Sequence, residues 1–302
     1  ALWLALVILG LFFLVELVGG LLTNSLALLS DAFHLLTDVA AVALALAAQW
    51  FARKPSNAKN SFGYRRVEIL AAQFNGFTLI VVAGYILYEA WIRLWDPPEV
   101  QSWPMIIVAT VGLVAQLFTA MVLSKAKGES LNVKGAYLHA MTDALQSLGV
   151  IAAGLIMAFT GWYLADPLVS ILLAVMVGWS GVHLLIEASH VLIEGTPAEL
   201  DLDRIAAQMQ QTPGVSKVTD LHAWSLTSGY NALSAHVEAN KEALERSGGF
   251  EELRRRLDQA LRQDHQVHHV TLQIELDCHG CRLKDCCGWL EEEGDHEPRK
   301  IA

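Results

Sequence analysis

Two His-x-x-x-Asp motifs stand inside long apolar stretches of the sequence, His34-Leu-Leu-Thr-Asp38 and His139-Ala-Met-Thr-Asp143. On a helix, residues four apart lie on the same face, so each motif presents an imidazole and a carboxylate one turn from each other. Two such helices together offer two nitrogens and two oxygens, a closed tetrahedral set that suits Zn2+. Ionisable groups at membrane depth are costly and mark ion paths or proton relays.

These types of ligand couple metal binding to the release of protons. Imidazole and carboxylate bind a metal only when they are deprotonated, so metal and protons compete for the same atoms. Burial and neighbouring charges bring both kinds of group to titrate in or near the physiological range. The four residues therefore suit an exchanger that moves metal one way and protons the other. The plainer alternative is two unrelated hydrogen bonds between helices, and the duplication of the motif disfavours it.

The composition indicates a membrane protein with several spans. Hydrophobic residues make up 54% of the chain and charged residues 17%, with a mean hydropathy of +0.39, whereas soluble domains are about 25% charged. A spanning helix takes roughly 20 apolar residues. The first run is too long and too uniformly apolar for the core of a signal peptide. We predict a six-helix transmembrane bundle within residues 1–194, with helices over 3–22, 26–52, 65–95, 102–124, 130–160 and 167–192.

Positive charges orient this bundle, because loops rich in Lys and Arg stay in the cytoplasm. The second break between apolar runs and the fourth carry such residues, and the first and fifth carry none. With six spans, both termini are then expected in the cytoplasm, together with the residues that follow the bundle. The charges in question are Arg53, Lys54, Lys59, Arg65, Arg66, Lys125, Lys127 and Lys134.

The region from residue 195 to 277 has the composition of a soluble domain. Its pattern alternates as helix, strand, strand, helix and strand, which predicts a small cytosolic α+β domain of ferredoxin-like (αββαβ) kind. A net charge of −10 does not suggest nucleic-acid binding. The expected elements are 199–211, Val215–Leu226, Asn231–Glu238, Phe250–Arg262 and His269–Leu276.

Residues 278–302 form an acidic tail that holds all four cysteines of the chain. Cys278-His-Gly-Cys281 is a good half-site for zinc, because both thiolates can reach one ion. Cys286 or Cys287 would complete it, or a histidine would. The alternative is an exposed, reduced tail without metal.

Four segments closely resemble the cation diffusion facilitator family, over essentially the whole chain. They are SLALLSDAFHLLTD (25–38), FGYRRVEILAAQFNG (62–76), HAMTD (139–143) and Asp166-Pro167. The resemblance implies a homodimeric secondary transporter, not an enzyme, that exports cytoplasmic Zn2+ in exchange for protons by alternating access. It maps the transport site onto His34, Asp38, His139 and Asp143. The alternative function is a metal sensor, or a carrier of other divalent cations (Co2+, Ni2+, Cd2+).

The resemblance also implies a second zinc site in the cytosolic domain, which would stabilise the dimer or sense metal. The expected ligands are His236 and Glu275, supported by His268 and with His222 nearby, while Thr219 occupies another ligand position of the family. Histidines without metal are the alternative. The segment 52–61 contains no Asp or His, so we expect no metal there. The segment 125–134 contains no histidine, which favours a transporter of the bacterial inner membrane.

An intramembrane zinc enzyme is a further class to consider. Such a protease would need a His-Glu-x-x-His motif, which the sequence lacks. A catalytic zinc also keeps one position open for water, whereas four protein ligands leave none. We therefore expect transport rather than catalysis.

Overall fold

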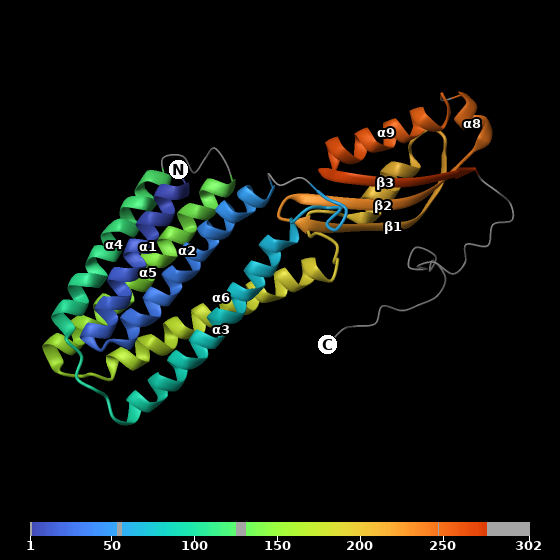
Figure 1. The fold of residues 1–302 in the computed structure, drawn as a ribbon. Helices are drawn as coiled ribbons and strands as arrows, with labels where there is room; N and C mark the ends of the chain where they lie inside the picture. Colours follow the sequence, from blue (N-terminus) through green and yellow to red (C-terminus); the bar gives the residue numbers. More distant parts are fainter. Residues whose placement is uncertain (1, 53–55, 125–130, 247, 277–302) are drawn as a thin grey trace. The chain divides into compact units, whose positions relative to one another are not determined.

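A computed structural model describes residues 2–52, 56–124, 131–246 and 248–276 of the chain (Figure 1). The chain divides into two compact units, Ala1–Ala188 and Ser189–Ala302. Each unit is described by itself. The tail over 278–302, with the predicted ligands Cys278 and Cys281, lies outside the described residues.

The first unit consists of six long helices, one for each predicted apolar run. Five of them are long and apolar enough to cross a membrane, and α4 carries a shorter apolar stretch, Ser102–Phe118, in its described part. Their large apolar side chains point outward in many places, as lipid-facing surfaces require. The prediction of an all-helical membrane domain is confirmed by α1 (Leu2–Thr23), α2 (Leu26–Ala52), α3 (Arg66–Trp95), α4 (Ser102–Ser124), α5 (Leu131–Thr160) and α6 (Ala165–Leu192).

Helices α1, α2, α4 and α5 lie side by side in Figure 1. The core between α2, α4 and α5 includes Leu28, Met105 and Val150. Helices α3 and α6 pack on each other where both carry glycine. A Cβ added to Gly181 would lie 3.0 Å from the carbonyl oxygen of Gly76, so only small residues allow this approach.

The second unit is a three-stranded sheet with helices packed on it, which confirms the predicted α+β domain. The strand order is β1-β2-β3, with β1 antiparallel and β3 parallel to β2. The short helix α8 is additional to the prediction and precedes α9 in the crossover between β2 and β3. The elements are α7 (Leu202–Gln210), β1 (Val215–Thr227), β2 (Tyr230–Ala239), α8 (Lys241–Arg246), α9 (Gly249–Asp264) and β3 (Val267–Leu276).

The alternation of buried and more exposed side chains along the strands decides which face of the sheet the helices cover. Leu233 and Val237 of β2 are buried in one core with Leu253, Leu257 and Leu261 of α9. Residues of opposite parity on β2 therefore point to the other face of the sheet. His236 of β2 is one of them. The register places His222 of β1 and Glu275 of β3 on the same face, because His222 pairs with Ser234 and Glu275 with Glu238 of β2.

Candidate metal site in the membrane unit

Helices α2 and α5 bring three of the four predicted membrane ligands together. The Nε2 atom of His34 lies 3.0 Å from Oδ1 of Asp143. One ligand atom from each of His34, Asp38 and Asp143 lies within 4.8 Å of the others, a spacing that could hold a metal ion. His139 stands one turn before Asp143 on α5, and its side chain lies outside the described part of the structure.

The three side chains are largely shielded from solvent, and His34 and Asp38 line a cavity. The His34 and Asp143 side chains are 12% and 8% exposed. The cavity measures about 290 Å³ and is lined by α2, α3, α5 and α6. A buried carboxylate without a cation is costly, so two carboxylates and an imidazole at one point favour a divalent cation there. Polar lining residues offer further oxygens and nitrogens to a partly hydrated ion: Thr37, Asn75, Thr142, Gln146 and Ser180.

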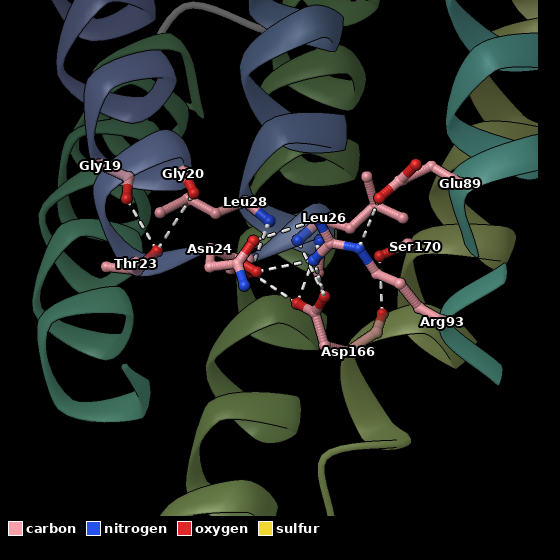
Figure 2. A network of polar contacts seen from close by, with 12 residues as sticks. Gly19, Gly20, Thr23, Asn24, Leu26, Leu28, Glu89, Arg93, Asp166 and Ser170 are labelled. Atoms are coloured by element: carbon pink, nitrogen blue, oxygen red, sulfur yellow. Dashed lines mark hydrogen bonds and ion pairs between the residues drawn. The ribbon is translucent and has the colours of Figure 1, made fainter. Parts of the chain in front are cut away.

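A carboxylate from α6 fixes the point at which α2 begins (Figure 2). Asp166 accepts hydrogen bonds from the Ser25 hydroxyl (2.6 Å) and from the backbone N–H groups of Leu26 (2.8 Å) and Ala27 (3.1 Å). These N–H groups have no partner inside their own helix, and a negative charge at a helix N-terminus is favourable. Asp166 is thus a cap supplied from a distant part of the sequence.

Arg93 of α3 joins the same network (Figure 2). Its guanidinium donates to the carbonyl oxygen of Asn24 (2.7 Å) and to Glu89 (3.1 Å), and Nη1 lies 3.9 Å from Asp166 Oδ2. Asn24 adopts a left-handed backbone (φ 57°), which asparagine tolerates and which separates α1 from α2. Helices α3 and α6 together hold the start of α2, and with it the height of His34 along the bundle.

The predicted cytosolic ligands are brought together only in part. His222 Nε2 lies 2.9 Å from Asp220 Oδ1, and His236 Nε2 lies 3.7 Å from Asp220 Oδ2. Asp220 therefore links two predicted ligands, although it was not among them. It has a positive φ (50°) and lies in a register shift between Thr219 and His222. An acidic residue two positions before a strand histidine was the signal in the sequence.

The other two predicted ligands on β3 lie apart from each other. His268 stacks on Tyr230 with ring centroids 5.0 Å apart. Glu275 stands seven residues further along the strand, which corresponds to about 23 Å, so both cannot bind one ion within a single subunit. Glu275 accepts a hydrogen bond from Gln273, the register partner of His236. Across the described residues, the membrane trio is the single group of three with metal-ligand spacing.

Comparison with known proteins finds a matching family model for each of the two units. The family model for the cation efflux transmembrane domain matches residues 2–193, and the model for the cytoplasmic domain of cation efflux proteins matches residues 197–277. Together they account for nearly all of the described chain.

Curated relatives are similar along most of their length. The metal cation efflux system protein CzcD of Cupriavidus metallidurans is 45% identical over 90% of this chain and 85% of its own. The cadmium, cobalt and zinc/H(+)-K(+) antiporter of Bacillus subtilis is 39% identical over 94% of this chain and 92% of its own. The zinc transporter ZitB of Escherichia coli is 37% identical over 91% of this chain and 87% of its own. The chain therefore belongs to the cation diffusion facilitator family of integral membrane cation efflux transporters, which are not enzymes.

Proposed function

We propose that the protein exports Zn2+ from the cytoplasm in exchange for protons, with His34, Asp38, His139 and Asp143 as the transport site. The observation that carries the proposal is the largely shielded group of His34, Asp38 and Asp143, contributed by two membrane helices beside a cavity. The names of the relatives support it, since they include a zinc transporter and a zinc/H(+)-K(+) antiporter.

The proposed cycle follows from the ligand chemistry. The two carboxylates offset the charge of Zn2+, while the imidazoles favour Zn2+ over harder cations. Binding displaces protons from the ligands, and protons arriving from the other side displace the metal in turn. The cavity is lined on one side by α2 and α5, which carry the ligands, and on the other by α3 and α6. A relative movement of these pairs would expose the site alternately to the two sides of the membrane.

The proposal also covers the membrane, the orientation of the chain, its oligomeric state and its cytosolic metal site. We infer a bacterial inner membrane with both termini in the cytoplasm, from the Lys and Arg residues of the second and fourth loops. The family's cytoplasmic domain is expected to hold a homodimer together and to bind further zinc. His222 and His236 around Asp220 are the centre that we favour for this cytosolic site. His268 and Glu275 remain proposed ligands, as do Cys278 and Cys281 in the tail.

The test is Zn2+ uptake into proteoliposomes under an imposed pH gradient, with wild type compared to Asp38→Ala. We expect wild-type uptake to follow the proton gradient and Asp38→Ala to show none, because the ion loses a charged ligand in a buried site. Asp96→Ala, the same substitution at an exposed position after α3, is the matched control and should behave as wild type. Uptake that survives in Asp38→Ala would move the transport path away from the quartet.

Broader metal selectivity is a second candidate, because one relative is named for cadmium, cobalt and zinc together. His34→Asp should retain Zn2+ transport and raise the Cd2+/Zn2+ uptake ratio by about tenfold, a change of about 1.4 kcal/mol. A carboxylate binds through one oxygen or two, which accommodates a larger ion than a single imidazole nitrogen does. His183→Asp on α6, where the side chain is 68% exposed, is the control. An unchanged ratio in His34→Asp would refute a selective role for His34.

A further inference from the structure

Two carboxyl groups that the proposed transport site does not use are buried in the membrane unit. Glu16 of α1 and Asp31 of α2 are each 1% exposed. Neither oxygen of Glu16 has a hydrogen-bond partner in the described structure, and Oδ1 of Asp31 has none either. Oδ2 of Asp31 accepts a hydrogen bond from the Ser147 hydroxyl of α5 at 3.0 Å.

The local packing directs Glu16 toward α5. A Cβ added to Gly112 of α4 would lie 2.6 Å from Glu16 Oε1 and 3.8 Å from Ser147 Oγ. The absent side chain at Gly112 therefore leaves the space that the Glu16 carboxyl occupies next to Ser147. Because Ser147 also donates to Asp31, the Glu16 carboxyl lies close to the hydrogen bond between Ser147 and Asp31.

The charged groups around this pair are the proposed metal ligands. Asp31 of α2 and Asp143 of α5 act electrostatically on Glu16. His34, Asp38 and Asp143 act on Asp31. Yet neither Glu16 nor Asp31 belongs to the group whose ligand atoms lie within 4.8 Å of one another. The pair thus stands next to the proposed site and outside the group of its closest ligand atoms.

The burial of Glu16 decides its charge when no metal is bound. An unpaired carboxylate in an apolar interior costs several kcal/mol and takes up a proton instead. A divalent cation at the site would reverse this balance, because its charge attracts the carboxylate form.

We propose that Glu16 and Asp31 form a proton-binding site beside the metal site, which releases a proton when Zn2+ binds and regains it when Zn2+ leaves. This inference rests on the proposed Zn2+/H+ exchange. In the release step the carboxyl O–H bond breaks, its electron pair stays on the oxygen, and the proton passes to water. The new carboxylate offsets part of the charge of the incoming ion. The pair thereby adds to the protons that the metal ligands themselves exchange.

A permanently protonated Glu16 that only fills space is the competing explanation, and glutamine imitates that state. Zn2+ is titrated at pH 7 into the purified full-length protein by calorimetry in two buffers of different ionisation enthalpy. The difference gives the number of protons released per Zn2+ bound. We expect Glu16→Gln to bind Zn2+ and to release about one proton fewer than wild type, since binding is coupled to deprotonation. Protons released at cytosolic sites cancel in this comparison.

The matched control is Glu187→Gln on α6, where the side chain is 64% exposed and the proton count should equal that of wild type. An unchanged count in Glu16→Gln would overturn the proposal, and so would loss of Zn2+ binding, which would make Glu16 a ligand. If Glu16→Gln does not fold, Glu16→Met, which fills the same space without a carboxyl group, provides the same test with the same expected loss. If wild type releases no protons on binding Zn2+, both the exchange mechanism and this site are refuted. If wild type shows proton-coupled uptake but both variants release as many protons per Zn2+ as wild type, this site alone is refuted.

Discussion

Asp143→Ala is expected to reduce Zn2+ uptake to the level of empty vesicles. The substitution removes a charged ligand from a buried site, and it also removes the hydrogen-bond partner of His34, whose Nε2 lies 3.0 Å from Asp143 Oδ1. Loss of a group that merely orients a ligand costs 10–100-fold in metal affinity. Loss of a ligand together with the orientation of a second one should lower the affinity by more than about 100-fold, so that few sites are occupied at a Zn2+ concentration that half-saturates wild type.

The coupling between these two residues can be measured by a double-mutant cycle. If His34 and Asp143 act as one unit, His34→Ala and Asp143→Ala combined should weaken Zn2+ binding much less than the sum of the single effects. Additive losses would mean that the 3.0 Å contact has no part in metal binding. Asp96→Ala controls for the general effect of removing an aspartate from this unit. Asp143→Ala protein that still transports Zn2+ at the wild-type rate would refute the proposed site.

The sequence predicted that His34, Asp38 and Asp143 lie close together, because two independent signals coincided. Apolar runs of bilayer length set the positions of α2 and α5, and the four-residue spacing set the face on which His34, Asp38 and Asp143 lie. Both signals are local, so each can be read from one stretch of chain. The sequence signals for the breaks between helices are equally local. At Asn24, for example, one residue with a left-handed backbone separates α1 from α2.

The contacts that hold the site were not predictable in the same way. Asp166 caps a helix that begins 140 residues earlier, and its sequence neighbours indicated only a turn before α6. The surroundings of Glu16 could not be predicted from the sequence, because they depend on Gly112 of α4 and Ser147 of α5. In the cytosolic domain, Asp220 was missed because its position between His222 and His236 depends on a register shift in β1. Long-range partners of this kind become visible only when the helices and strands are assembled.

Asp166→Ala should be the most destabilising single substitution among those considered. The donors that it leaves without an acceptor are the Ser25 hydroxyl and the N–H groups of Leu26 and Ala27, which are all fully buried. Each buried donor without a partner costs about 1–3 kcal/mol, so three of them approach the total stability of about 5–15 kcal/mol that a folded protein has. The nearby Arg93 guanidinium also loses its carboxylate neighbour. We expect Asp166→Ala to lower the melting temperature of the detergent-purified protein by roughly 10 °C or more.

Asp201→Ala is the informative control, because Asp201 caps α7 in the soluble unit through one bond, from the Arg204 N–H at 3.1 Å. An exposed cap of this kind contributes about 0.5–2 kcal/mol. Asp166→Asn keeps the shape and one acceptor oxygen, so its melting temperature should fall between wild type and Asp166→Ala. If Asp166→Ala melts no lower than Asp201→Ala, the start of α2 is held by other contacts. The capping network would then not be what sets the height of His34 and Asp38 in the bundle.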